Sequence, residues 1–108
     1  MAKEMPRSPL APDSFPDLPV VDGVRFATTA AGVVYSGRTD VMLAVVDPGT
    51  AVAGVFTKSS TRAAPVLDCQ AKIGAPSDGR AAILVNSGNA NAFTGHFGQT
   101  SVNELTAA

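Results

Sequence analysis

One stretch of the chain indicates the fold more than any other: AAILV at residues 81–85, followed directly by NSGNANAFTG at residues 86–95. The apolar run is typical of a buried strand. Asn and Gly favour turns and left-handed backbone, so the polar run is costly to order. At the end of a buried strand, such a segment indicates a backbone shaped around a ligand. The alternative is a long turn whose amides hydrogen-bond to their own backbone.

Two more strands are expected on the N-terminal side. Residues 24–29 alternate and are rich in β-formers, and residues 33–35 are expected to continue this strand. Residues 41–46 are continuously apolar, which is typical of a strand covered on both faces. Asp-Pro-Gly-Thr at residues 47–50 has the signature of a type II turn. Residues 51–57 are then expected to return as the second strand of an antiparallel hairpin.

A first helix is expected from Pro65, a residue that suits the first helical position. Its apolar stripe is formed by Val66, Cys69 and Ile73, and Gly74 is a natural end. On this inner stripe, Cys69 is expected to be a buried structural thiol.

A second helix is expected to begin near Ser101, because Ser101 and Glu104 have the spacing of a capping box. The chain stops at Ala108 after about two turns, and isolated helices of that length are marginal. This ending predicts a fragment of a longer protein, cut inside a helix.

The domain organisation follows from these elements. Residues 1–19 are predicted to be a proline-rich N-terminal arm, and residues 20–108 the N-terminal part of an α/β domain truncated within a helix. The arm cannot be a regular element because it contains Pro6, Pro9, Pro12, Pro16 and Pro19.

Composition excludes several classes of function. The net charge is −1, no basic run exists and aromatic residues are sparse, so a nucleic-acid partner is not expected. No apolar segment reaches the 18 or more residues that span a bilayer, and the N-terminus lacks a signal core. A cytoplasmic protein without a membrane partner is therefore expected. The single cysteine rules out an internal disulfide.

Familiar catalytic signatures are missing, and one His with one Cys does not make a metal site. The lone loop residue His96 is interpreted as a surface residue and not as a base. Carboxylates near turns and helix surfaces are interpreted as solvated or capping groups: Asp40, Asp47, Asp68 and Asp78. Lys58 and Arg62 are interpreted as a solvated face, with a substrate carboxylate as the alternative partner for one of them.

The asparagine-rich segment remains the candidate site. It leads into the N-terminus of the second helix, where free N–H groups and the helix dipole favour a negative group. Asn side chains can both donate and accept, which suits a polar amino-acid ligand, although the charge of Glu104 opposes an anion. The candidate site-supporting residues are Asn86, Ser87, Gly88, Asn89, Asn91, Thr94 and Gly95.

The same segment resembles the signature of the ornithine acetyltransferases (glutamate N-acetyltransferases) of arginine biosynthesis. Upstream segments resemble that family in the same order, and the resemblance covers about residues 16–108. Phe93 stands where many members carry Cys, so no thiol chemistry is carried to it. The upstream matches are Ala31-Gly32, Gly37-Arg38 with Asp40, Ala53-Gly54-Val55-Phe56-Thr57 and Ala63-Ala64-Pro65-Val66.

The resemblance implies an α/β sandwich of helices over sheets, of the self-processing terminal-threonine acyltransferase type, of which this chain is a partial domain. It implies transfer of acetyl from N-acetylornithine, and in some members from acetyl-CoA, to glutamate through an acyl-threonine intermediate. No cofactor is expected. The parent would cleave itself and assemble with its β chain into a heterotetramer.

The nucleophilic threonine and the oxyanion Thr-Gly pair of that family lie beyond Ala108, so no catalytic residue is assigned in this chain. Residues 1–108 alone are therefore predicted to be inactive. Two alternatives stay open. One is a related self-processing amidase or aminopeptidase, and the other is a non-catalytic assembly module.

Overall fold

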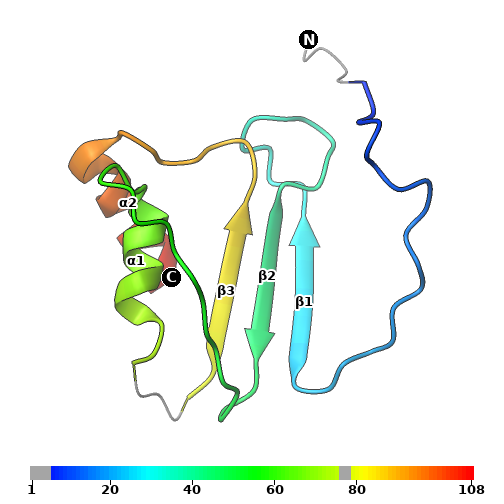
Figure 1. Ribbon diagram of the computed structural model, residues 1–108, viewed down its shortest axis with the longest axis horizontal. Coiled ribbons are helices and arrows are strands. Elements are labelled where there is room, and N and C mark those ends of the chain that lie inside the picture. The colour runs from blue at the N-terminus through cyan, green and yellow to red at the C-terminus, as the bar shows by residue number, and fades with distance from the viewer. Residues whose placement is uncertain (1–5, 76–78) are drawn as a thin grey trace.

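The computed structural model describes residues 6–75 and 79–108. Three strands form an antiparallel sheet in the order β1-β2-β3, and two helices lie beside it (Figure 1). This small α/β arrangement agrees with the coarse fold class expected from the sequence. The elements are β1 (Val24–Thr29), β2 (Val41–Val46), α1 (Ala64–Lys72), β3 (Ala81–Asn86) and α2 (Gly95–Ala107).

The central strand β2 pairs along its whole length with both neighbours. Val41 lies opposite Thr29 of β1 and Asn86 of β3, and Val46 lies opposite Val24 and Ala81. Because directly paired residues share a face, the register defines two faces of the sheet. One carries Val24, Phe26, Thr28, Met42, Ala44, Val46, Ala81, Ile83 and Val85, and the other carries Arg25, Ala27, Thr29, Val41, Leu43, Val45, Ala82, Leu84 and Asn86.

The predicted hairpin between residues 41–46 and 51–57 is wrong, although its turn forms. Thr50 N donates to Asp47 O at 3.2 Å, and Gly49 has φ +85° as a type II turn requires. A type II turn splays the flanking strands because its twist opposes theirs. Both edges of β2 are also occupied, so residues 51–57 form no strand and run toward α1.

The expected continuation of the first strand through residues 33–35 is also wrong. The ladder ends at Thr29, because Asp40 draws the following backbone into a loop: its carboxylate accepts hydrogen bonds from Ala31 N and Val33 N, each at 2.7 Å. The intervening Gly32 has φ +75°, a conformation that no strand residue adopts. Residues 30–40 therefore form a loop at the end of the sheet where β3 also ends (Figure 1).

Helix α1 confirms the helix expected near Pro65. It begins one residue earlier, at Ala64, and its C-cap Ile73 donates from its N–H to Cys69 O at 2.9 Å. Gly74 follows with φ +83°, the left-handed residue that commonly ends a helix.

The expected start of α2 near Ser101 is wrong, because the helix begins at Gly95 with Thr94 as its N-cap. Ser101 and Glu104 therefore lie inside the helix and form no capping box. Two buried residues four positions apart, Gly98 and Val102, lie on one face of α2, and the helix as a whole contacts α1. This packing outweighs the low helix propensity of glycine.

Neither helix covers the sheet. The two helices contact each other, and neither has a Cα within 8 Å of a strand residue. Cys69 is exposed, so its predicted burial is wrong; the buried residue of α1 is Ala64. Of the predicted stripe, Val66 and Ile73 are half-buried, with Ile73 close to Gly54, and Cys69 is exposed.

The described part of the N-terminal arm, residues 6–19, contains no helix or strand and is exposed at nearly every position. Residues 1–5 of the predicted arm lie outside the described residues. The arm leaves the sheet on the β1 side, away from the helices (Figure 1).

Candidate functional site

The asparagine-rich loop, residues 86–95, begins at the last residue of β3 and ends at the first residue of α2. Its side chains bond mainly to the loop itself. Asn86 Nδ2 donates to Asn89 O at 2.9 Å, and Asn89 Oδ1 accepts from Asn91 N at 3.3 Å. Thr94 Oγ1 donates to Asn91 O at 3.2 Å. The side chains of Asn86, Asn89 and Thr94 thus shape the path of the loop, and the backbone of Asn91 supplies two of the partner atoms.

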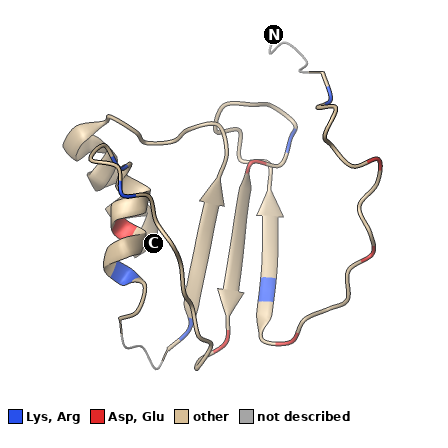
Figure 2. Cartoon of the chain, in the orientation of Figure 1, with Lys and Arg blue, Asp and Glu red and all other residues tan. Residues whose placement is uncertain are grey.

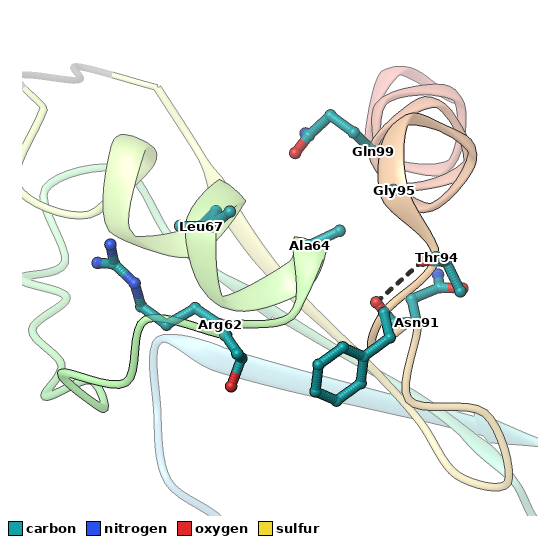
Figure 3. Close-up of a pocket in the computed structure, with 9 residues that line it drawn as sticks. Arg62, Ala64, Leu67, Asn91, Thr94, Gly95 and Gln99 are labelled. Atoms are coloured by element: carbon teal, nitrogen blue, oxygen red, sulfur yellow. Dashed lines mark hydrogen bonds between the residues drawn. The ribbon is translucent and has the colours of Figure 1, made fainter.

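A pocket of about 240 Å³ lies between this loop and the start of α1 (Figure 3). Asn91, Thr94 and Gly95 stand on one side, and Ala64 and Leu67 on the other. The two walls are about thirty residues apart in the chain. The full lining is Thr61, Arg62, Ala64, Leu67, Asn91, Phe93, Thr94, Gly95 and Gln99.

The structure divides the candidate residues into two groups. Asn91, Thr94 and Gly95 line the pocket. The other four lie at the base of the loop, where the chain leaves β3, and do not line it: Asn86, Ser87, Gly88 and Asn89. The wall made by Thr61, Ala64 and Leu67 overlaps the segment of residues 63–66 that resembles the family, but only the fold shows that it lies opposite the asparagine-rich loop.

Arg62 lines the pocket but does not aim its charge into it. Its guanidinium donates to Gln70 Oε1 at 2.9 Å, and in Figure 3 the side chain extends along α1, away from Asn91 and Thr94. In this arrangement a ligand carboxylate in the pocket would meet the backbone end of Arg62 and not the guanidinium.

The loop holds two non-glycine residues in left-handed backbone, Asn91 with φ 46° and Phe93 with φ 56°. Asn tolerates this region through its short polar side chain, whereas Phe does so only at a cost of about 1–2 kcal/mol. Strained residues of this kind gather at functional sites. Phe93 is also 87% exposed, so among the described residues nothing packs on the ring to offset the strain.

The first turn of α2 opens beside the pocket. Among the residues that the structure describes, no side chain caps this helix end, and its first turn contains no acidic residue. The sequence placed Glu104 near this terminus as an opposing charge, but the earlier start of α2 puts Glu104 ten positions into the helix. The positive end of the helix dipole is therefore available to a negative group at Thr94 and Gly95.

Asp40 is the buried charged residue of the described chain, with 4% of its surface exposed. Hydrogen bonds from the backbone N–H of Val33 and of Ala31 hold the pKa of this carboxyl below its ordinary value. The interpretation of Asp40 as a solvated or simple capping group is therefore wrong, because Asp40 is buried and binds the backbone of the loop of residues 30–40.

Other side chains considered for chemistry lie apart from the pocket. His96 is exposed, and its ring centroid lies 4.1 Å from that of Phe97. Among residues 6–75 and 79–108, no group of three or more His, Cys, Asp or Glu side chains could hold a metal ion. No helix in these ranges is long and apolar enough to span a membrane.

Comparisons with known proteins identify relatives of the chain. The profile of the ArgJ family matches residues 25–108. The "Arginine biosynthesis bifunctional protein ArgJ" of Ruegeria pomeroyi is 76% identical over 108 residues, which is 100% of this chain and 26% of that relative. Proteins of the same name from Bradyrhizobium diazoefficiens and Rhizobium meliloti are 61% and 49% identical, each over 93% of this chain and 24% of the relative.

The chain thus spans about a quarter of the length of the curated relatives that it matches. No solved structure matches it significantly. The match to the family profile covers all four upstream segments and the whole asparagine-rich loop, and it confirms the resemblance found in the sequence. The chain belongs to the ArgJ family.

Proposed function

We propose that residues 1–108 are the N-terminal part of a glutamate N-acetyltransferase that moves an acetyl group from N-acetylornithine to glutamate. The observation that carries this proposal is the family match over residues 25–108, with relatives named for arginine biosynthesis. In the proposed reaction a threonine hydroxyl outside this chain attacks the acetyl carbonyl and ornithine leaves. The amine of glutamate then attacks the acyl-threonine and frees the hydroxyl.

The pocket beside the asparagine-rich loop supports a small polar ligand. Its volume of about 240 Å³ suits an amino acid better than a larger cofactor. The amide groups of Asn91 and Gln99 can donate to a carboxylate, and the Thr94 hydroxyl, which itself donates to Asn91 O, can accept from an amine. The uncapped start of α2 adds a positive potential on the same side. We assign these groups to substrate binding and not to proton transfer, because amides are poor bases.

The two apolar faces of the sheet support the sandwich fold of the proposal. Arg25 is the one charged residue in the three strands, and most of the remainder are apolar (Figure 2). An antiparallel sheet that faces water on one side alternates apolar and polar residues. We therefore propose that helices cover one face and a second sheet the other, both supplied by the rest of the α chain and by the β chain.

The remaining features of the proposal follow from the family resemblance. The precursor cleaves itself before the nucleophilic threonine, the two products assemble as a heterotetramer, and the enzyme works in the cytoplasm. Residues 1–19 serve as an arm, and residues 20–108 as the first part of the α-chain domain.

The test is an acetyl-transfer assay on the full-length protein that carries these residues, with N-acetylornithine as donor and glutamate as acceptor. Acetylglutamate should form, and residues 1–108 purified alone should give none. Acetyl-CoA serves as a second donor in a parallel reaction. Hydrolysis of peptide substrates without transfer would replace the proposal by an amidase or aminopeptidase function.

A second assay separates a site role of the loop from a purely structural one. Asn91→Ala removes a pocket amide, whereas Asn86→Ala removes a bond within the loop. The proposal expects Asn91→Ala to raise the KM for an amino-acid substrate. If both variants keep wild-type kinetics and only melt at lower temperature, the segment is an assembly module and not part of a site.

A further inference from the structure

We propose that Asp40 is a positioning residue, which joins the ends of all three strands and so holds the asparagine-rich loop against the substrate pocket. Asp40 touches neither the pocket nor any reacting group, and it acts through the backbone that it binds. This inference rests on the proposed function, because it names a residue on which the same pocket depends.

Four hydrogen bonds meet at Asp40. Its carboxylate accepts from Ala31 N and Val33 N, each at 2.7 Å, one on each oxygen. Its own N–H donates to Thr29 O at 3.1 Å, and its carbonyl accepts from Ser87 N at 2.8 Å. One residue therefore ties together the end of β1, the start of β2 and the end of β3.

A close packing contact adds to these bonds. A Cβ on Gly88 would lie 3.0 Å from Cβ and Cγ2 of Val34, and Gly88 has φ +100°. The two loops at this end of the sheet are thus in contact where the asparagine-rich loop leaves β3. The position of Val34 depends in turn on the carboxylate of Asp40, which holds the preceding residue, Val33.

From this base a series of hydrogen bonds reaches the pocket. Asn86 Nδ2 binds Asn89 O, Asn89 Oδ1 accepts from Asn91 N, and Thr94 Oγ1 binds Asn91 O. Asn91 and Thr94 line the pocket. A shift of Ser87 at the base would therefore move the polar wall of the pocket, although Asp40 is not part of that wall.

A carboxylate is required at this position. Both oxygens accept, and the residue is 4% exposed, so water cannot replace a lost acceptor. The low pKa of Asp40, caused by the N–H groups of Val33 and Ala31, is consistent with a charged acceptor. An asparagine of nearly the same shape would turn an N–H₂ group toward one of these N–H donors.

The experiment compares Asp40→Asn with Asp47→Asn in the full-length protein. Asp47 stands at the opposite end of β2 in an exposed ion pair with Arg25 at 3.7 Å, so the control makes the same chemical change far from the loops. For Asp40→Asn, the KM for the amino-acid substrate should rise about tenfold or more, with a smaller change in kcat, because the displaced wall binds substrate poorly. Asp47→Asn should keep the wild-type KM.

A merely structural role gives a different result. Partial unfolding lowers the concentration of active enzyme and leaves the KM of the folded fraction unchanged. Amide hydrogen exchange of the same proteins is a measurement that does not depend on enzymatic activity. Asp40→Asn should accelerate exchange across residues 86–95, and not only across residues 30–34. An unchanged KM, or faster exchange confined to residues 30–34, overturns the proposal.

Gly88→Ala provides a second variant in case Asp40→Asn does not fold. Its new Cβ would press on Val34 and strain the left-handed backbone, so it displaces the same loop base without touching Asp40. It should raise the KM in the same direction, and a wild-type KM would overturn the proposal. If the unmodified protein transfers no acetyl group, the proposed function has failed, and the exchange experiment still decides the role of Asp40.

Discussion

At the scale of single residues, a buried charge and a strained backbone conformation lie near the asparagine-rich loop. Asp40 holds a charge at 4% exposure, and Phe93 holds φ 56° with an exposed ring. Both lie at or near the same end of the sheet as the asparagine-rich loop. Each has a consequence that can be measured.

The buried carboxylate predicts a dependence of stability on pH. The pKa of Asp40 lies below its ordinary value of 3.8 in the folded protein, so the unfolded chain binds the proton more tightly. The stabilisation by Asp40 is complete above that ordinary value, and it is lost as the pH falls through the lower folded pKa. The stability difference between wild type and Asp40→Asn should therefore shrink below about pH 4, as measured by denaturant unfolding at a series of pH values. A difference that stays constant down to about pH 2 would contradict this.

The strain at Phe93 predicts a stabilising substitution. Phe93→Asn places a residue that tolerates left-handed backbone at φ 56°, and it should stabilise the full-length protein by about 1 kcal/mol. Phe97→Asn is the control, because Phe97 is also exposed but lies within α2 and should gain nothing. Thermal melting compares the two. A loss of stability at position 93 would show that the ring packs against another part of the protein.

At the scale of elements, the pair of helices decides where the pocket lies. α1 supplies one wall, and the early start of α2 brings Gly95 and Gln99 to the other. The two helices contact each other, and Ala64 of α1 and Gly98 and Val102 of α2 are buried. Lys72 Nζ also donates to Thr106 Oγ1 at 3.1 Å near the other end of the pair.

The packing of α2 predicts the effect of a cavity. Val102→Ala removes two buried methyl groups and should destabilise the protein by about 1–2 kcal/mol. Ser101→Ala, at the neighbouring exposed position, should be neutral or slightly stabilising because alanine favours the helix. Chemical denaturation of both variants measures the difference. Equal effects would mean that Val102 does not hold the helices together.

At the scale of the whole molecule, the described residues leave much apolar surface uncovered. The radius of gyration is 16.3 Å, whereas a compact domain of this length has about 13 Å. Phe26 is 68% exposed, and Ile83, Leu84 and Val85 are each more than 40% exposed although they lie in strands. This pattern agrees with a sheet that the remainder of a longer chain covers.

The uncovered sheet predicts a substitution whose cost depends on the rest of the protein. Phe26→Ala should destabilise the full-length protein by about 3 kcal/mol, the usual cost of truncating a buried aromatic ring. Phe15→Ala, in the arm and 85% exposed, should change stability by less than about 0.5 kcal/mol. Unfolding measurements on both variants decide the matter, and a neutral Phe26→Ala would mean that this face stays open to solvent.

The sequence predicted most local structure because apolar runs reflect burial, and residues such as Pro and Gly reflect backbone preference. The apolar runs at residues 41–46 and 81–85 are strands, the Asp-Pro-Gly-Thr segment is a type II turn, and α1 ends before Gly74. The predictions were wrong where contacts with residues distant in the sequence decide the local structure. Residues 51–57 form no strand because β1 and β3 occupy both edges of β2, and α2 begins at Gly95 because Gly98 and Val102 are buried.

The sequence by itself determined the family of this protein, its strands and the loop that carries its signature, because these depend on residue order and short-range preference. Only the tertiary structure decided that Asp40 is buried between two loops and that Asn91 and Thr94 face the start of α1 across a pocket. The physical reason is that these contacts join Asp40 to residues seven, nine and forty-seven positions away, and the two pocket walls about thirty positions apart, and none of them produces a periodic pattern in the sequence. Burial of a charge and the shape of a pocket are properties of such contacts.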